Sequence, residues 1–434
     1  MMQSDIKKIV IIGGGFAGTA LAKSLEKKLS VNWDIYLLSK TNSITYNPLL
    51  TEVVGASILP AHVQAPLRLI LRRTRIRMVT VDRIDFSDKT VYYHNDEAAS
   101  LQYDQLVFAN GLGANTGMLP GLREHALPLK TVGDALHIRN TILERLEQAT
   151  IHSDPDRRKL LTKFVVIGGG FSGVEVAGEI NDYLKSAARY YKNVKTGDCL
   201  VSILQNSDRL LPELPVKLSR KTKDSFVKRG IKVYLNSSAE KIAKEKIVLE
   251  SGEVLRAATI ICTVGSQPHK FCQCPELPRV NGRIVTQSDM SVAGIEGIWA
   301  LGDCALVPNR YDNKPCPPTA QFADRQGKLL AANIIEKLRG GKTRAFLYKP
   351  LGKLASIGRN NAVGEIYGFS ISGLVAFLIW RAVYLLKVPT LSRKVRLYLE
   401  WSWAMLFPPD IAHLGFERSG EDSPEFPKHE EKRQ

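Results

Sequence analysis

The segments KIVIIGGGFAGTALAKS at residues 8–24 and KFVVIGGGFSGVEVAGE at residues 163–179 are two copies of one pattern. In each copy a short apolar run enters a glycine-rich turn, and an apolar-periodic segment follows. This order predicts a buried parallel strand, a tight turn and the start of a helix. The G-x-G-x-x-G spacing falls on Gly13, Gly15 and Gly18 in the first copy and on Gly168, Gly170 and Gly173 in the second.

The three glycines of such a unit have different physical roles. The first makes the turn, the second lets the backbone approach a pyrophosphate, and the third lets helix and strand pack closely. The phosphates then meet the free N–H groups of the first helical turn. One copy alone is also compatible with a simple close contact between helix and strand. Two copies, about 155 residues apart, predict an α/β fold with two Rossmann-like dinucleotide-binding domains.

Composition narrows the classes of partner. A chain of 434 residues allows two or three domains. Sixty Lys+Arg against 43 Asp+Glu give a net charge of +17, which favours an anionic partner: nucleic acid, a membrane surface or an acidic ligand. The six cysteines include no C-x-x-C pair. This argues against a disulfide framework, a dithiol redox centre and a zinc site, and it fits a reducing compartment.

The residues that end the second strand of each unit bear on ribose binding, because an acidic residue usually binds the ribose hydroxyls there. Ser39 follows strand 33–38, and it could bond a hydroxyl or simply start a turn. Gln205 ends strand 200–205. A neutral amide does not repel a 2′-phosphate, so this site could admit NADPH as well as NADH. Alternatively, Gln205 only caps the strand.

Other positions could complete the two sites. Three apolar strands run into turns, at Asn110-Gly111, at Gly265 and at Gly302-Asp303. The Asp303 carboxylate could accept from ribitol or ribose hydroxyls, or it could form a local Asx turn. Pro48, in the apolar segment 45–57, could wall a flat ring or belong to a loop packed on the core. We expect Glu175 in the first turn of the second helix, where it complements the helix dipole and could reach the nucleotide.

The C-terminal part has a different character. Residues 371–380 form an apolar run, and residues 381–416 interleave apolar and aromatic residues with Arg and Lys. This composition predicts amphipathic helices at the surface of an anionic membrane. The runs are too short to span a bilayer singly. A dimerisation surface or a core helical hairpin is the alternative. Residues 151–159 are predicted to form a polar linker, and residues 417–434 a disordered tail.

Taken together, these motifs carry a family resemblance. The chain resembles the type II NADH:quinone oxidoreductases, also called alternative NAD(P)H dehydrogenases, among the two-dinucleotide-binding-domain flavoproteins. The resemblance rests on both GGGF units, TYNPLL at 45–50, LLP at 210–212, ALGDCA at 300–305, PPTAQFADRQG at 317–327 and the amphipathic C-terminus. It implies FAD at the first unit, completed by Gly302-Asp303, and NADH or NADPH at the second, with Glu175 orienting the nicotinamide. The A-Q-x-A segment, with Gln321 and Gln326, is implied to lie beside the flavin ring and the quinone.

The resemblance also implies an organisation and an activity. The FAD-binding domain is expected at 1–118 and 265–345, the inserted NAD(P)H-binding domain at 119–264, and the membrane-association region at 346–416. The implied activity is hydride transfer from NAD(P)H to FAD, followed by transfer of two electrons to a membrane quinone without ion pumping. The implied location is peripheral, on the cytoplasmic face of the inner (plasma) membrane, with an anionic lipid surface as partner and a homodimer as a further possibility.

Three departures from the family pattern leave alternatives open. Ser39 and Gln205 stand where acids are usual, and Arg325 stands where the A-Q-x-A-x-Q motif has Gln. A sulfide:quinone reductase would need active-site cysteines, for which no paired candidates exist. A soluble flavin reductase would lack the interfacial C-terminus. A flavoprotein could also bind nucleic acid through the basic surface, but the aromatic residues cluster in apolar runs, so no nucleic acid partner is expected.

Overall fold

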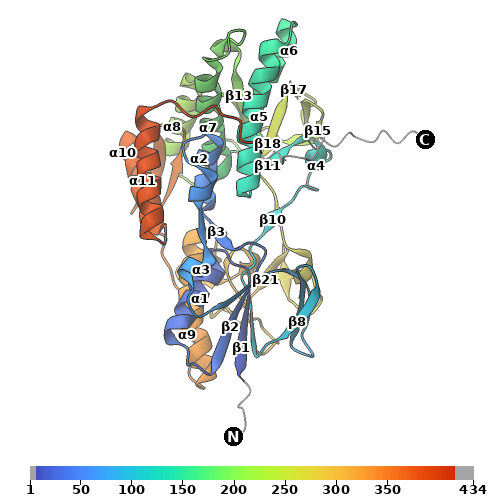
Figure 1. The fold of residues 1–434 in the computed structure, drawn as a ribbon, viewed down its shortest axis with the longest axis vertical. Helices are drawn as coiled ribbons and strands as arrows, with labels where there is room; N and C mark the ends of the chain where they lie inside the picture. The colour runs from blue at the N-terminus through green and yellow to red at the C-terminus, as the bar shows by residue number, and fades with distance from the viewer. Residues whose placement is uncertain (1–5, 416–434) are drawn as a thin grey trace, which may run out of the picture.

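The computed structural model describes residues 6–415, so the predicted tail at 417–434 lies outside the described residues. The molecule has two lobes, each built on a five-stranded sheet (Figure 1). The first sheet has the order β22-β9-β1-β2-β5, and all its pairs are parallel. Its strands are β1 (Lys7–Ile12), β2 (Trp33–Ser39), β5 (Arg75–Met78), β9 (Gln105–Phe108) and β22 (Ile298–Ala300). The run 9–12 is fully buried, as expected for a central parallel strand.

The second sheet repeats this arrangement. Its order is β11-β18-β12-β13-β14, again parallel throughout. Its strands are β11 (Leu127–Pro128), β12 (Lys163–Ile167), β13 (Leu200–Leu204), β14 (Lys232–Tyr234) and β18 (Thr259–Cys262). Each glycine unit therefore occupies the central strand of its own sheet. The predicted α/β fold with two Rossmann-like units is confirmed.

Each lobe also carries a three-stranded antiparallel meander. The first contains β6 (Thr80–Asp85), β7 (Thr90–His94) and β8 (Ala98–Gln102). The second contains β15 (Ala239–Ala243), β16 (Lys246–Leu249) and β17 (Val254–Arg256). The chain passes from the first lobe to the second at β10 (Gly113–Ala114) and returns at β19 (Ser266–Gln267), and these two strands pair antiparallel. Figure 1 shows β10 in this crossing.

Helices cover both sheets. In the first lobe α1 (Phe16–Lys28) packs on α9 (Ala320–Leu338), and a methyl group at Gly327 would meet the backbone of α1 at 2.6 Å. In the second lobe the main helices are α5 (Val132–Ile151), α7 (Phe171–Ala188) and α8 (Val216–Lys228). The prediction of a linker at 151–159 is wrong in part, because α6 occupies Pro155–Leu161. Asp154 caps this helix by accepting from Asp156 N at 2.9 Å, and Pro155 fits its first turn.

The C-terminal region adds a sheet that the sequence does not predict. It contains β26 (Gly352–Ser356), β27 (Ala362–Ile366) and β28 (Phe369–Gly373), and two helices follow. The helices are α10 (Leu374–Lys387) and α11 (Leu391–Leu406), and Pro389 lies in the turn between them. They lie beside α2 (Leu50–Val54) and α8 along one side of the molecule (Figure 1). Within residues 6–415, no helix combines the length and the apolar character needed to cross a bilayer.

Candidate functional site

The first glycine unit forms an open cradle at the start of α1. Gly13 has φ +112°, a conformation that favours glycine, and a methyl group there would overlap the carbonyl group of Ala109. Gly15 is the N-cap of α1, and no side chain caps this end of the helix. No described atom lies within 4 Å of where a Cβ of Gly15 would be. The helix therefore begins with free N–H groups facing open space, which is the arrangement that binds a phosphate.

The carboxyl ends of β1, β9 and β22 meet around this cradle. Asn110 follows β9, and its Cα lies 2.7 Å from where a Cβ of Gly13 would be. Gly302 follows β22 and packs on Ala17 of α1. Parallel sheets bind their ligands at this edge. The structure thus brings together three of the turns that the sequence singles out, those at Gly13, Asn110-Gly111 and Gly302-Asp303.

Gln326 holds one of these turns in place. It is 1% exposed, and its Oε1 accepts a hydrogen bond from Gly302 N at 2.8 Å. This buried bond gives Gln326 a positioning role for the turn. Asp303 is half-buried, and burial raises its pKa while Arg283 and Lys130 oppose the rise. Its carboxylate has the chemistry to accept from sugar hydroxyls.

Ser39 and Gln205 occupy equivalent places in the two units. The Ser39 hydroxyl faces the middle glycine of its turn, at 2.7 Å from where a Cβ of Gly14 would be. In the second unit Gln205 Oε1 accepts from Gly169 N at 2.9 Å. Both side chains are buried and neutral, so neither strand end presents a carboxylate to a ribose.

The second glycine unit repeats the cradle. Gly168 has φ +112°, like Gly13, and Gly170 is the uncapped N-cap of α7 with no described atom within 4 Å of a Cβ. The side chains of Thr263 and Val264, after β18, close the turn from beside Gly168. Gly265 has φ +82° and packs on Met118 and Asn115, at the crossing between the lobes. It therefore shapes the linker next to the second cradle.

Glu175 does not lie in the first turn of α7, so that prediction is wrong. It is the fifth residue of the helix, and the first turn contains no acidic residue. The side chain is 5% exposed, and its Oε1 accepts from Ser356 N of β26 at 3.2 Å. Burial raises the pKa of Glu175 to about 8, helped by the nearby charge of Glu52. Glu175 therefore faces the C-terminal region, and a protonated carboxyl can persist there near neutral pH.

The start of α9 forms a wall of polar side chains near Lys387, the last residue of α10. Gln321 Oε1 accepts from the Tyr348 hydroxyl at 3.2 Å, and the Arg325 guanidinium lies 4.1 Å from the centre of the Tyr348 ring. The Arg325 side chain also donates to the backbone of Gln321 at 3.1 Å. The departure from Gln to Arg at this position thus adds a cation that stacks on an aromatic ring.

The segment 45–57, which contains Pro48, forms a second wall near the end of α10. Pro48 lies half-buried in the short helix η1 (Asn47–Leu49). The neighbouring Tyr46 ring packs edge-on against Phe16, with centroids 5.4 Å apart, and its hydroxyl donates to the Lys387 carbonyl at 3.2 Å. This segment therefore connects the start of α1 with the end of α10.

Sequence reasoning missed a buried polar cluster under α10 and α11. Glu52 is 2% exposed, its Oε1 lies 3.7 Å from an Arg381 nitrogen, and its Oε2 accepts from Trp401 Nε1 at 2.6 Å. Glu179, also buried, lies close by on α7. Two charges in apolar surroundings were the only signals of this cluster in the sequence. Glu52 lies within the apolar segment 45–57, and Arg381 directly follows the apolar run 371–380.

The cysteines do not form a reactive pair. All six are free thiols. Burial raises the pKa of Cys304 to about 12, and it raises the pKa of Cys272, whose thiol donates to Asn110 Oδ1 at 3.5 Å. Thiols in such surroundings stay protonated and unreactive.

Two cradles of one topology, joined by paired linkers and covered by a helical C-terminal region, define a protein of the two-dinucleotide-binding-domain class. The chain belongs to the pyridine nucleotide-disulphide oxidoreductase family, whose model matches residues 7–327, and its residues 351–409 match the NDH2 C-terminal domain. These matches confirm the family resemblance read from the motifs.

Individual relatives cover nearly the whole chain. A probable NADH dehydrogenase of Dictyostelium discoideum is 28% identical over 417 residues, which cover 94% of this chain and 91% of the relative. A type II NADH:quinone oxidoreductase of Mycobacterium tuberculosis is 29% identical over 419 residues, covering 92% and 88%. The structure of NDH2 from Plasmodium falciparum in complex with NADH has a TM-score of 0.86 at 20% identity, covering 94% of this chain and all of that one (100%). This last likeness shows the fold.

Proposed function

We propose that the chain is a peripheral-membrane NAD(P)H:quinone oxidoreductase that holds FAD at the first unit and receives NADH or NADPH at the second. The observation that carries the proposal is the pair of uncapped helix starts, at α1 and α7, in a chain whose C-terminal helices expose an apolar face. The names of the relatives, NADH dehydrogenase and type II NADH:quinone oxidoreductase, support the reaction.

The residues of the first unit fit FAD. The free N–H groups after Gly15 would bind its pyrophosphate, and Asp303 would accept from hydroxyls of the ribitol or ribose. When bound, FAD supplies a two-electron carrier between a hydride donor and a quinone. Ser39 offers only a hydroxyl at the ribose, so the phosphate cradle and Asp303 carry more of the binding.

The second unit fits a nicotinamide cofactor that comes and goes. The N–H groups after Gly170 would bind its pyrophosphate, and Gln205 would face its ribose. Because Gln205 is neutral, it would not repel the 2′-phosphate of NADPH. Glu175 lies on α7 between this cradle and the C-terminal region, where we assign it the orientation of the nicotinamide end.

The quinone would reach the polar wall formed by α9, η1 and α10. Gln321 and Tyr348 supply hydrogen-bonding groups there, and Arg325 supplies a positive charge. Tyr46 and Pro48 supply apolar surface that suits a flat ring. No side chain acts as a nucleophile in this proposal, and no ion transport is coupled to the electron transfer.

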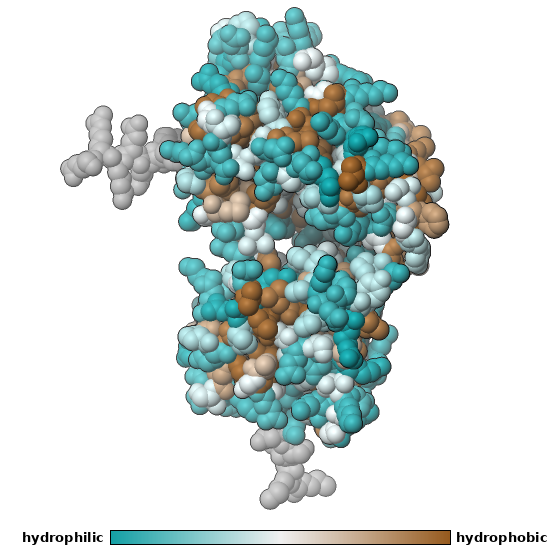
Figure 2. All heavy atoms as spheres, turned by 180° about the vertical axis from the view of Figure 1, so that it is seen from behind, coloured by the Kyte–Doolittle hydropathy of each residue, from teal (hydrophilic) through white to brown (hydrophobic). Residues whose placement is uncertain are grey.

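The exposed face of α10 and α11 fits an anionic membrane surface. Apolar side chains gather along this side of the molecule in Figure 2. Those on α11 and just after it are at least 40% exposed: Leu391, Val395, Tyr398, Leu399, Trp403, Met405, Leu406 and Phe407. Arg393, Lys394 and Arg396 lie on the same helix and would meet anionic headgroups. We place this surface on the cytoplasmic face of the inner membrane.

A vesicle assay tests the membrane part of the proposal. The double variant Leu399→Ser/Leu406→Ser removes two side chains that are 59% and 78% exposed, so it should leave folding intact. We expect the wild type to sediment with vesicles that contain anionic lipid. The variant should bind about 10²-fold more weakly, because about 3 kcal/mol of apolar burial is lost. Equal binding would refute the membrane face. A homodimer through this face would appear instead as a loss of dimer in the variant.

A further inference from the structure

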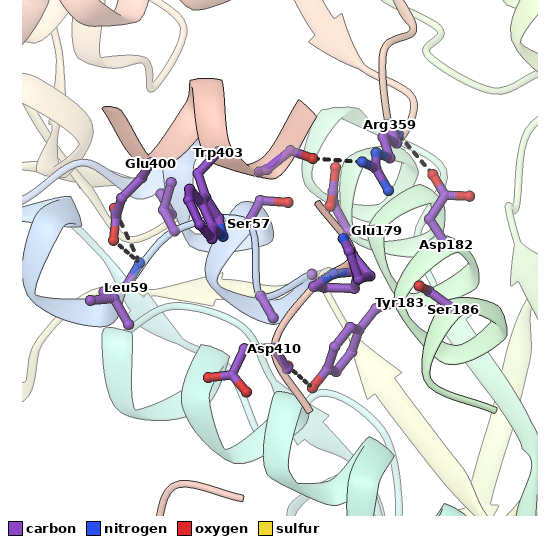
Figure 3. Close-up of a pocket in the computed structure, with 16 residues that line it drawn as sticks. Ser57, Leu59, Glu179, Asp182, Tyr183, Ser186, Arg359, Glu400, Trp403 and Asp410 are labelled. Atoms are coloured by element: carbon purple, nitrogen blue, oxygen red, sulfur yellow. Dashed lines mark hydrogen bonds between the residues drawn. The ribbon is translucent and has the colours of Figure 1, made fainter. Parts of the chain in front are cut away.

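A cavity of about 250 Å³ lies between α7, α11 and the segment 55–59 (Figure 3). Its volume is ample for a small organic group, since one molecule of liquid water takes about 30 Å³. Four acidic side chains and one basic side chain line its walls: Glu179, Asp182, Glu400, Asp410 and Arg359. This surplus of acidic groups favours a cationic occupant.

Three of the four acidic side chains have partners already. Asp182 lies 2.6 Å from a nitrogen of Arg229. Glu400 lies 2.6 Å from His62 Nδ1. The side chain of Asp410 is 67% exposed, so water can solvate it. Neighbouring protein groups and solvent therefore compensate these three carboxyl groups.

Glu179 is the exception among the acidic side chains. It is 5% exposed, and within residues 6–415 it makes neither a hydrogen bond nor an ion pair. Its carboxyl group lies so close to Gly55, another residue of the cavity wall, that a methyl group there would overlap it. A buried polar group without a partner costs free energy. A donor that enters the cavity from outside would remove this cost.

The cation that fits these walls is an organic ammonium. Among the described residues, no group of three or more His, Cys, Asp or Glu side chains is arranged to hold a metal ion. The aromatic side chains of Tyr183 and Trp403 line the cavity, and aromatic faces attract ammonium groups. The hydroxyls of Ser57 and Ser186 line it as well. Together with the Glu179 carboxyl, these hydroxyls can accept the hydrogen bonds that a primary ammonium donates.

Arg359 adds a positive charge at the mouth of the cavity. It is exposed, and its backbone N–H donates to Asp182 Oδ2 at 2.7 Å, which ties it to α7. One guanidinium nitrogen donates to the carbonyl groups of Ala404, Met405 and Phe407 at distances of 2.7, 3.2 and 3.2 Å. The other two guanidinium nitrogens make no hydrogen bond within the described part of the chain. They can donate to a phosphate group.

The cavity opens beside the apolar face that we assign to the membrane. Leu59 and Trp403 line it and are 51% and 63% exposed. Leu399 and Leu406 lie on α11 with Trp403 and are 59% and 78% exposed. A lipid whose headgroup entered the cavity could therefore place its acyl chains along these side chains.

We propose that this cavity binds the headgroup of an ethanolamine phospholipid. The inference rests on the proposed function, because it names a lipid that the proposed membrane face would hold. Such a lipid carries a primary ammonium, then a phosphate, then its acyl chains. The protein presents the complementary groups in the same order: the Glu179 carboxyl inside the cavity, the Arg359 guanidinium at its mouth and the apolar side chains of α11 outside. A choline headgroup has methyl groups on its nitrogen and donates no hydrogen bond there.

Vesicle binding by the full-length chain tests the lipid preference. Two kinds of vesicle contain the same fraction of anionic phosphatidylglycerol, and the remainder is phosphatidylethanolamine in one and phosphatidylcholine in the other. Both of these lipids are zwitterionic, so the general attraction to the basic protein is equal. We expect the wild type to bind the ethanolamine vesicles about tenfold more tightly, the contribution of one hydrogen bond between charged groups. Glu179→Gln should bind both kinds of vesicle alike.

Two further variants separate the cavity from general effects. Glu365→Gln is the matched control, because it makes the same change at a half-buried glutamate of β27 outside the cavity. It should keep the wild-type preference. Ser57→Leu narrows the cavity without changing a charge, and it should lose the preference as Glu179→Gln does. Differences in bilayer packing between the two lipids act on all variants alike, so they cannot produce this pattern.

The lipid preference should also depend on pH, because the ammonium binds the carboxylate form of Glu179. Burial raises the pKa of Glu179 well above its usual range, negative charges on α2 and α7 add to the rise, and guanidinium groups on α10 and at the end of α8 oppose it. The preference of the wild type should therefore grow as pH rises from about 6 to about 8, and Glu179→Gln should show no such growth. The charged groups that face Glu179 are Glu52, Asp182, Arg229 and Arg381, with Arg359, Glu400 and Asp410 across the cavity.

Soluble phosphoethanolamine distinguishes a lipid from a free ligand, since it has the same ammonium and phosphate without acyl chains. In calorimetric titrations we expect it to bind the wild type only in the millimolar range and to show no binding to Glu179→Gln, because the acyl chains supply most of the apolar burial. Micromolar binding of the soluble compound, together with equal binding to both kinds of vesicle, would assign the cavity to a free ligand and overturn the lipid proposal.

Equal binding of the wild type to both kinds of vesicle would overturn the inference and leave the membrane face intact. A preference that Glu179→Gln retains would overturn it as well. A wild type that binds neither kind of vesicle would refute the membrane part of the proposed function, and the headgroup site with it.

Discussion

The substitution Gln205→Glu tests the proposal that Gln205 lies at the ribose of the bound nicotinamide cofactor. The Gln205 Oε1 accepts from Gly169 N at 2.9 Å, so a glutamate can keep this bond and occupy the same place. It would add a full negative charge at the end of β13. A 2′-phosphate bound there would lie about 5 to 6 Å away, and at an effective dielectric constant of about 20 the repulsion is about 3 kcal/mol.

That free energy corresponds to about 10²-fold in kcat/KM for NADPH. For NADH the change has the opposite sign, because a carboxylate accepts from ribose hydroxyls more strongly than an amide does, by about 1 kcal/mol. We therefore expect the ratio of kcat/KM for NADPH to kcat/KM for NADH to decrease by a factor of about 10² to 10³. Both substrates are measured in the same steady-state assay.

Asn206→Asp is the matched control, because it adds the same charge at the next, exposed residue. Its effect should be several-fold smaller, since solvent screens an exposed charge. An unchanged ratio in Gln205→Glu, or an equal fall in both variants, would refute the placement of Gln205 at the ribose.

Three further predictions address the cradles and the buried carboxyl. Gly170→Ala should fold normally, because its methyl group meets open space. The variant should raise KM for NAD(P)H at least about tenfold, because one charge-assisted hydrogen bond to the phosphate is lost. An unchanged KM would contradict phosphate binding at this position. Gly18→Ala should lower the free energy of unfolding by at least about 2 kcal/mol in urea titrations, because its methyl group would overlap the carbonyl oxygen of Gly13; wild-type stability would contradict the packing. The folded chain holds the Glu175 proton more tightly than the unfolded chain does, so the free energy of unfolding should fall as pH rises from 4.5 to about 8. Thermal melts of Glu175→Gln should show a weaker fall over this range. An identical pH dependence in the wild type and the variant would count against the raised pKa of Glu175.

Local spacing explains why both glycine units could be predicted from the sequence. The shape of each unit depends on residues that are close in the sequence, such as Gly13 and Gly18. The continuous apolar run before each unit identifies a buried parallel strand. The positions of Ser39 and Gln205 beside the glycine turns could be predicted as well, because each residue ends the second strand of its unit. The convergence of Asn110 and Gly302 on the first cradle required only the known topology of a parallel sheet.

The features that could not be predicted depend on contacts between distant segments. Glu175 is buried against the C-terminal region, where Ser356, 181 residues away, donates to it. From the sequence alone, Glu175 was expected in the first turn of its helix, within reach of the nucleotide. The helix α6 begins at an Asp-Pro pair that also fits a turn, so local propensity could not separate the two. The sheet β26–β28 ends inside the apolar run 371–380, where a short apolar segment fits strand and helix equally.

An anaerobic spectroscopic titration of the purified full-length chain tests the central claim most directly. The account predicts a yellow protein whose visible absorbance bleaches with NADH or NADPH and returns on addition of a soluble quinone. A colourless protein, or one that bleaches but regains no colour with any quinone, would contradict it.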